Sequence, residues 1–306
     1  MKPETQSFYE RAVQRALEHV VAHLDDALDL DRLARQAALS PFHFHRIFRG
    51  MVGETPLELH RRLRLQRAAQ HLLQTETPVT TLALDAGYDT HEAFTRAFRQ
   101  HYGYPPSELR KERLEGTSCA RPHQIEIATR SGLHFRADTR AYDLSHLIQG
   151  DRNMNVTIEN RPELRTAALR HIGPYHRISE AFARLGDLAG HAGLLKVRPT
   201  MLAIYHDDPE VTPESELRSD AAIVIPPDVR VPGGLTEQHV PGGRYAKTTH
   251  LGSYSELGDT WARFMGQWLP GSGERLGSGV TYEIYVNNPT EVAPEQLHTD
   301  LYIPLA

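Results

Sequence analysis

Two different internal repeats constrain this chain more than any other feature of its sequence. Segment 40–49 recurs fifty residues later as 90–99, with phenylalanine and arginine at matching places in both copies. In the C-terminal half, segment 171–175 returns seventy-nine residues later as 250–254. Since each kind of repeat is a small structural unit that packs against its copy, we expect two domains of different fold class.

The first repeat has helical periodicity. Its apolar residues fall at the spacing of one buried helix face, as Phe44, Ile47, Phe48 and Met51 do. Ser40 and Thr90 stand where a helix N-cap is expected, and a short helix is predicted before each. Helix, tight turn and capped helix predict two helix-turn-helix units, joined by a long helix that starts at a capping box, Thr55 to Glu58.

The opposite face of the second helix in each unit is predicted to point outward and to bind DNA. Its residues are Phe42, His45, Arg46 and Arg49 in the first copy, and His91, Glu92, Thr95, Arg96 and Arg99 in the second. An arginine on such a helix can donate to guanine or to phosphate. The alternative for Arg46 and Arg96 is that they lie on a helix face that contacts only solvent. The alternative for Glu92 is that its charge stabilises the helix N-terminus.

The second repeat predicts an α+β domain. Each half has the pattern strand, helix, strand, turn, strand, so we expect a duplicated unit with an antiparallel sheet, a pseudo-twofold axis and a cleft where the halves meet. Asp207-Asp208 precedes a proline, and so does its counterpart Asn287-Asn288. A shared need for turn-forming side chains explains both pairs, so a paired-acid site is the less favoured interpretation.

Glu283 is the most informative residue of the second repeat, because its counterpart Ala203 shows that the fold itself needs no acid there. Strand alternation places Glu283 beside aromatic side chains, where a carboxylate is costly unless a bound cation pairs with it. The predicted effector-binding residues are Glu283, Tyr285, Tyr205, Met201, Tyr175, Tyr254 and Trp268. The alternative is an edge-strand glutamate that faces solvent.

Composition excludes several classes of protein. The chain is 40% hydrophobic and 24% charged, and no apolar run approaches the ~20 residues of a membrane span. The first 116 residues hold 16 basic and 16 acidic side chains, so the net charge of −5 lies in the remainder. A charged, helix-periodic N-terminus does not fit a signal peptide, and we expect a cytoplasmic protein. Cys119 is the one cysteine and His43 and His45 do not share a helix face, so no metal or cofactor is expected.

Residues from about 8 to 113 resemble the DNA-binding domain of the AraC/XylS family. The resemblance rests on Arg46 to Arg49, Gly53 with Pro56, Leu82-Ala83, Ala86 to Tyr88, Phe94 to Phe98, and Tyr104 to Pro106. It implies that the two outward faces bind double-stranded DNA, with RNA polymerase as a further partner. One departure is Ala38, where the second copy has Gly87. A left-handed alanine costs about 1 kcal/mol, so we expect a different geometry for the first turn.

Residues from about 154 to 306 resemble the GyrI-like effector-binding domain. The matching segments are 171–175, 205–209, 242–245, 250–254, 282–285 and 300–304. The resemblance implies multidrug sensing, with lipophilic and often cationic effectors bound around a buried glutamate that matches Glu283. We therefore expect domains at 1–116 and 154–306. Between them lies a linker, 117–153, in which 124–128 and 133–136 can form a short hairpin.

The leading hypothesis is a transcription regulator that is not an enzyme and acts as a monomer or homodimer. Two alternatives stay open. One is a GyrI-like hydrolase of reactive xenobiotic compounds fused to a DNA-binding domain, which turnover of a bound compound would reveal. The other is a protein-interaction module, which binding to gyrase would reveal.

Overall fold

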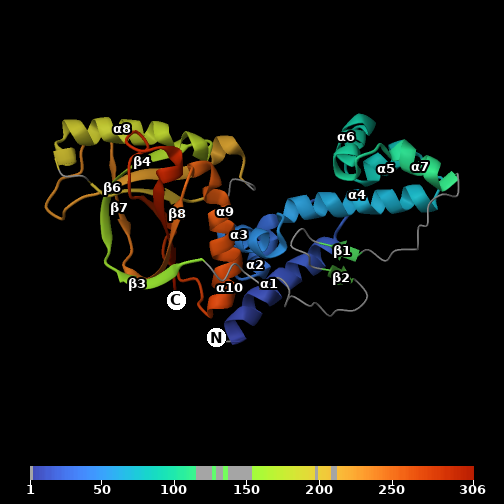
Figure 1. Cartoon of the computed structure of the whole chain (residues 1–306), viewed down its shortest axis with the longest axis horizontal. Helices are drawn as coiled ribbons and strands as arrows, with labels where there is room; N and C mark the ends of the chain where they lie inside the picture. Colours follow the sequence, from blue (N-terminus) through green and yellow to red (C-terminus); the bar gives the residue numbers. More distant parts are fainter. Residues whose placement is uncertain (1–2, 115–125, 129–133, 137–153, 197–198, 208–211) are drawn as a thin grey trace. The chain divides into compact units, whose positions relative to one another are not determined.

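A computed structural model describes residues 3–114, 126–128, 134–136, 154–196, 199–207 and 212–306 (Figure 1). Contacts divide the chain into two compact units. The first comprises residues 1–9, 40–50 and 150–306, and the second comprises 10–39 and 51–149. Segment 40–50, from the first copy of the helical repeat, therefore belongs to the same unit as the whole of the second repeat.

The N-terminal region is helical, as predicted. Its helices are α1 (Pro3–Ala22), α2 (Leu30–Gln36), α3 (Pro41–Val52), α4 (Pro56–Gln74), α5 (Val79–Asp85), α6 (His91–Tyr102) and α7 (Pro106–Leu114). The predicted caps are present: Thr90 accepts a hydrogen bond from the Ala93 amide at 3.1 Å, and Ser40 accepts one from the His43 amide at 3.3 Å. A full capping box at Thr55 starts α4, which then continues unbroken for 19 residues.

The second helix-turn-helix packs on the C-terminal half of α4. Figure 1 shows α5, α6 and α7 gathered there. Phe94 and Phe98 of α6 are fully buried in a core that also takes side chains from α4, α5 and α7, namely Leu65, Ala68, Ala69, Leu72, Leu82, Ala83, Ala86 and Leu109. The buried face of α6 is the one that the helical periodicity predicts.

The turns of the two helix-turn-helix units have the same geometry. Ala38 has φ +56° and Gly87 has φ +79°, so both are left-handed. In the first turn the Leu39 amide donates to the Ala34 carbonyl at 3.1 Å, and in the second the Tyr88 amide donates to Ala83 at 3.0 Å. The expectation of a different first turn is therefore wrong, because these hydrogen bonds hold alanine in the conformation that glycine adopts freely.

The C-terminal region is one eight-stranded antiparallel sheet. Its strand order is β3-β8-β10-β9-β5-β6-β4-β7. The strands are β3 (Val156–Arg161), β4 (Leu164–Ile172), β5 (Met201–Tyr205), β6 (Arg218–Val224), β7 (Thr236–Val240), β8 (Gly243–Leu251), β9 (Tyr282–Tyr285) and β10 (His298–Pro304). β5 pairs with β9 at the centre, so the two halves are related by a pseudo-twofold axis, as predicted. Each half also exchanges a strand, because β3 pairs with β8 and β7 pairs with β4.

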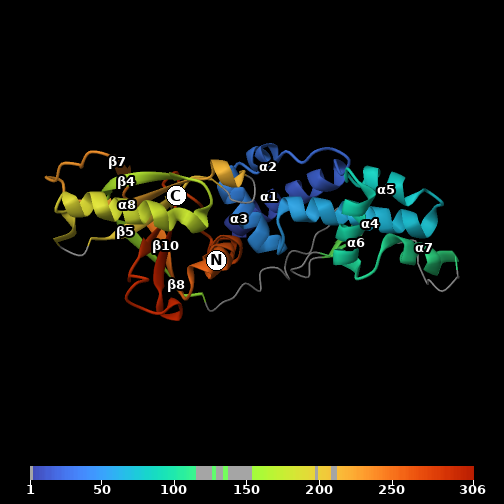
Figure 2. The same ribbon diagram turned by 90° about the horizontal axis from the view of Figure 1, so that it is seen from above.

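Helices cover one face of this sheet. α8 (Ile178–His191) lies across it in both views (Figures 1 and 2) and buries Leu185 and Ala189 against strand residues that include Ala203 and Ala221. In the second half the equivalent segment is α9 (Leu257–Arg263), followed by a π-helical stretch, η6 (Phe264–Trp268), and α10 (Leu269–Ser272). Short 3-10 turns complete the unit: η2 (Tyr175–Arg177), η3 (Leu194–Lys196), η4 (Glu214–Glu216), η5 (Tyr254–Glu256) and η7 (Pro294–Gln296).

Two short strands lie in the predicted linker. β1 (Glu126–Ala128) pairs antiparallel with β2 (His134–Arg136), as expected for a hairpin. The residues that join them, and Gln124 and Leu133 at the predicted ends, lie outside the described residues. Among the residues that the structure does describe, no helix combines the length and apolar character of a membrane span.

Candidate functional site

Glu283 is the centre of the candidate effector site. It lies on β9 opposite Ala203 of β5, on the sheet face that the helices cover, and is only 2% exposed. Its carboxylate accepts hydrogen bonds from Trp261 Nε1 at 2.6 Å, Tyr285 Oη at 3.1 Å and Tyr205 Oη at 3.2 Å. The alternative of a solvent-facing glutamate is therefore wrong, since both strands adjacent to β9 are present and the helical layer covers the carboxylate.

Aromatic rings surround this carboxylate. Tyr175 meets Tyr205 edge-on at 4.8 Å between ring centroids, and Tyr254 meets Tyr285 edge-on at 5.3 Å. The two contacts are related by the repeat, because each joins the first residue of a 3-10 turn to a tyrosine of a central strand. Met201 is half-buried opposite Tyr285 in the strand register. The structure thus gathers six of the seven predicted effector residues at or around Glu283.

The electrostatics favour a positive partner for Glu283. Burial raises the pKa of its carboxyl, and the Trp261 hydrogen bond and the positive charge of Arg46 act against that rise. Burial and the nearby carboxylate also raise the pKa of Tyr205 and Tyr285 well above the usual range of a phenol. Tyr205 and Tyr285 are therefore neutral hydrogen-bond donors to Glu283, and a positive charge beside this carboxyl group would favour its ionised form.

The tryptophan that contacts Glu283 is Trp261, which was not among the predicted effector-binding residues. The prediction placed Trp268 in the wall, but its ring packs on Phe264 at 5.4 Å, in the π-helical stretch, and Trp261 is the residue that donates to Glu283. A signal for Trp261 was present in the sequence, because the repeat aligns it with Phe182. Phe182 also lies at the site, edge-on to Tyr285 at 5.3 Å. Equivalent positions in the second repeat therefore predict the wall of the site better than aromatic character alone does.

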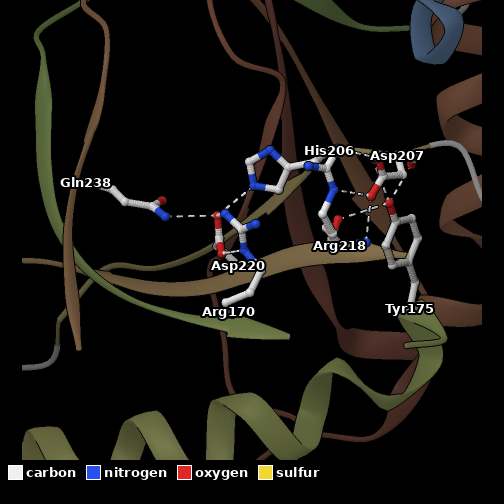
Figure 3. Close-up of polar contacts among 7 residues, drawn as sticks. All are labelled: Arg170, Tyr175, His206, Asp207, Arg218, Asp220 and Gln238. Carbon is white, nitrogen blue, oxygen red and sulfur yellow. Dashed lines mark hydrogen bonds and ion pairs between the residues drawn. The ribbon is translucent and has the colours of Figure 1, made fainter. Parts of the chain in front are cut away.

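Asp207 lies in a bend that follows β5, and it is the first residue of the predicted turn. Figure 3 shows the Tyr175 hydroxyl donating to the Asp207 carbonyl, which holds this ring in place beside the site. Asp207 Oδ2 accepts from the Arg218 amide at 2.7 Å, and Asn287 Oδ1 accepts from the His298 amide at 2.9 Å in the second half. The two Asx side chains therefore have the same structural task, while Asp208 lies outside the described residues.

A second polar cluster lies beside this turn (Figure 3). Asp220 of β6 is fully buried and receives hydrogen bonds from Arg170, from His206 Nε2 at 2.6 Å and from Gln238 Nε2 at 3.0 Å. Although burial alone would raise the pKa of Asp220, these hydrogen bonds lower it to about 2. A carboxylate with this set of partners is satisfied, so the cluster joins β4, β6 and β7 and leaves no vacant acceptor for a ligand.

The outward face of α6 is largely as predicted. His91, Glu92, Arg96 and Arg99 are exposed. Thr95 is the exception, because it is half-buried and its hydroxyl oxygen is buried with no hydrogen-bond partner among the described residues. A backbone hydrogen bond at the helix start, followed by a hydrogen bond with the Thr90 side chain, lowers the pKa of Glu92, which supports a helix-terminus role for its charge.

The outward face of α3 is not exposed, and here the prediction is wrong. Phe42 is 8% exposed and His45 is 3% exposed. Arg46 and Arg49 are half-buried. His43 Nε2 lies 3.2 Å from the Thr281 hydroxyl, and Arg49 lies 3.9 Å from Asp259. This face of α3 therefore packs within the first unit, a tertiary contact that helical periodicity does not encode.

Among the described residues, no group of three or more histidine, cysteine or acidic side chains could hold a metal ion. The groups that donate to the Glu283 carboxylate are two phenol hydroxyls and one indole N–H, which are not the ligands of a usual metal site.

Comparisons with known proteins cover both parts of the chain. Residues 154–306 match the GyrI-like small molecule binding domain, and residues 33–112 match a helix-turn-helix domain. The regulatory protein SoxS of Salmonella typhimurium is 32% identical over 102 residues, which are 33% of this chain and 95% of SoxS. A DNA gyrase inhibitor of Yersinia enterocolitica is 32% identical over 136 residues, 43% of this chain and 85% of that protein. An uncharacterized HTH-type transcriptional regulator, YbfP of Bacillus subtilis, is 36% identical over 34% of this chain, which spans only 35% of YbfP.

Proposed function

The chain belongs to the GyrI-like small molecule binding family and carries an AraC-type helix-turn-helix domain, and on that premise we propose that it is a transcription regulator whose effector is a lipophilic cation. Glu283 is the counter-ion of that effector. Tyr205, Tyr285, Tyr175 and Tyr254 supply the aromatic walls, and Trp261 orients the carboxylate.

The observation that carries the proposal is the burial of the Glu283 carboxyl group among aromatic rings. The groups that donate hydrogen bonds to Glu283 are all neutral, and the positive charge of Arg46 only partly offsets the effect of burial on its pKa. An ionised carboxylate in this setting is costly unless a cation pairs with it directly. A cation that enters between the tyrosine rings regains that energy through the ion pair and through cation–π attraction. The counterpart Ala203, fully buried and opposite in register, supports a ligand role because the fold tolerates a small apolar residue there.

Exposed basic residues support the DNA-binding half of the proposal. Arg96 and Arg99 are exposed on α6, with His91 at the start of the same helix. We assign Arg96 to the major groove and Arg99 to the phosphate backbone. Arg46 and Arg49 of α3 are assigned the equivalent contacts in a state in which α3 is uncovered. RNA polymerase remains a predicted partner.

The test replaces Glu283 with glutamine, which removes the charge and keeps the shape. Calorimetric titration of the full chain compares a cation, tetraphenylphosphonium, with a neutral molecule of similar build, triphenylphosphine oxide. We expect Glu283→Gln to weaken the cation at least tenfold and the neutral molecule less than twofold, because only the cation loses its ion pair. The melting temperature should stay at or above that of the parent, since burial of the charge raises the pKa of Glu283 and so opposes ionisation.

Glu295→Gln is the matched control, because it removes the same charge from an exposed residue of the same domain. It should leave both affinities unchanged. An equal loss for the two probes, or no loss, would show that Glu283 is not the counter-ion. Turnover of a bound compound, or capture of gyrase in place of a small molecule, would favour a hydrolase or an interaction module instead.

A further inference from the structure

Arg46 of α3 lies at the edge of the Glu283 site. Its guanidinium carbon lies 4.8 Å from the centre of the Trp261 ring and 4.5 Å from the centre of the Phe42 ring, so the cation is held between two aromatic faces. Trp261 in turn donates to Glu283 at 2.6 Å. The same indole therefore contacts both the guanidinium and the carboxylate that the effector is expected to pair with.

The positive charge of Arg46 affects the pKa values of residues at the site. It lowers the pKa of Glu283 and of Tyr205, in opposition to the larger effect of burial. A positive charge that stabilises the ionised carboxylate is doing what an effector cation would do. In this arrangement the protein provides its own counter-ion for Glu283.

The packing of α3 is specific at several further points. At Gly50 an added Cβ would lie 2.2 Å from the Ala262 carbonyl oxygen and 2.5 Å from Gly266 Cα, so only glycine allows this approach of α3 to the second-half helices. His43 contacts Thr281, two residues before Glu283, at 3.2 Å. Arg46 is therefore presented to the site by a close-packed helix and does not reach it as a flexible surface side chain.

Arg46 is also one of the residues assigned to the DNA. The guanidinium cannot be sandwiched by Phe42 and Trp261 and at the same time reach into a major groove, because one side chain cannot occupy both places. From these contacts we propose that Arg46 is a tethered occupant of the effector site, which a cationic effector displaces, so that α3 is released to bind DNA. This inference rests on the proposed function and names how the site is regulated.

Competition of this kind couples the two ligands. The effector must displace Arg46 in order to bind. Its apparent Kd is therefore its intrinsic Kd divided by the fraction of molecules in which α3 is released. DNA binding draws on the same released fraction. Effector and DNA therefore strengthen one another, and by linkage the factor is the same in both directions.

The first experiment removes the internal competitor. Tetraphenylphosphonium and triphenylphosphine oxide are titrated into the full chain, without DNA, for the parent, Arg46→Ala and Arg96→Ala. We expect Arg46→Ala to bind the cation about tenfold more tightly than the parent and the neutral molecule with little change. Arg96→Ala deletes the repeat-equivalent arginine, which is exposed on α6, and should leave the affinity for both probes as in the parent.

The second measurement needs no substitution. Hydrogen exchange of the parent is followed for peptides covering 41–52 and 91–102, with and without saturating tetraphenylphosphonium. Exchange in 41–52 should accelerate when the cation binds, while 91–102 stays unchanged and serves as the internal reference. This result guards against misinterpretation if Arg46→Ala folds poorly, and Arg46→Gln is the conservative second variant.

The outcomes separate the inference from the proposed function. Suppose that Glu283→Gln loses the cation, but that Arg46→Ala binds it no more tightly than the parent and 41–52 keeps its protection. Then the effector site stands and the tethered-occupant inference is overturned. If neither the parent nor Arg46→Ala binds the cation, both are overturned. A tighter Arg46→Ala together with faster exchange in 41–52 supports both.

Discussion

The two recognition helices α3 and α6 come from the same repeat but have opposite environments. Phe44 and Phe48 of α3 are buried, as are Phe94 and Phe98 of α6. The other face differs, because it is exposed in α6 and packs within the first unit in α3. The same supersecondary unit can thus be available in one copy and covered in the other.

Residue differences between the copies account for this contrast. Where α6 has Glu92, Ala97 and Gln100, α3 has Phe42, Ile47 and Gly50. A helix with apolar or small residues on both faces is one that will be buried on both, whereas a charged outer face favours solvent. The repeat therefore defines the helices, and the departures from the repeat define which of them is covered.

The largest expected effect is that of Gly50→Ala. Its Cβ would collide with the backbone of Ala262 and Gly266, so the covered state of α3 should lose about 3 kcal/mol, while α3 itself gains helix propensity. Hydrogen exchange in 41–52 should rise about a hundredfold. Gln100→Ala, at the matching position of α6, should change exchange in neither helix. Unchanged protection in Gly50→Ala would show that α3 is not held by this contact.

The next effect is on DNA binding. In the full chain without effector, Arg96→Ala should cost about 1–3 kcal/mol of binding to a selected operator, and Arg46→Ala should cost clearly less, because α3 is occupied elsewhere. With saturating tetraphenylphosphonium the two losses should become similar. Fluorescence anisotropy measures all four cases. Arg61, exposed on α4, is the control, because Arg61→Ala should weaken binding to all DNA sequences equally. Equal losses without effector would remove the functional contrast between the helices.

A smaller effect is expected from pH. Burial, with a further contribution from the charge of Arg46, lowers the pKa of His43 to about 4, whereas a released His43 titrates near 6.5. The covered state is therefore fully stable above pH 6.5 and weakens as the pH falls towards 4, because only the released state takes up the proton. At pH 5.5 this amounts to about a tenfold shift towards release.

Exchange in 41–52, compared between pH 7.5 and 5.5 after correction for intrinsic rates, measures this shift. His43→Ala copies Ala93 of α6 and should lose the His43-dependent part of the pH response. A parent and a His43→Ala variant with identical pH dependence would contradict the assignment.

The smallest effects concern the turns. Ala38→Gly should stabilise the chain by about 0.5 kcal/mol, since glycine adopts the left-handed conformation without strain but loses more entropy on folding. Gly87→Ala should cost about 1 kcal/mol or more, because its Cβ would also lie 2.2 Å from Arg64 Nη1. Thermal unfolding of the full chain resolves the opposite signs. Destabilisation by Ala38→Gly would show that the first turn is not strained.

Local chemistry and periodicity determined much of this protein from sequence alone. The capping box at Thr55, the buried face of α6 and the pairing of Ala203 with Glu283 all follow from rules that act over a few residues or between repeat copies. The repeat offset was enough to bring two tyrosines to one carboxylate, because equivalent strands meet at a pseudo-twofold axis.

Tertiary structure alone decided three things. It buried Phe42 and His45, it placed Trp261 and not Trp268 on Glu283, and it brought Arg46 to the effector site. For α3 the outcome depends on contacts between segments more than 200 residues apart. For the two tryptophans it depends on how the helical segment 257–268 packs on the sheet. Helical and strand periods state which side chains share a face, but the partner that covers a face is set by the free energy of packing the whole chain.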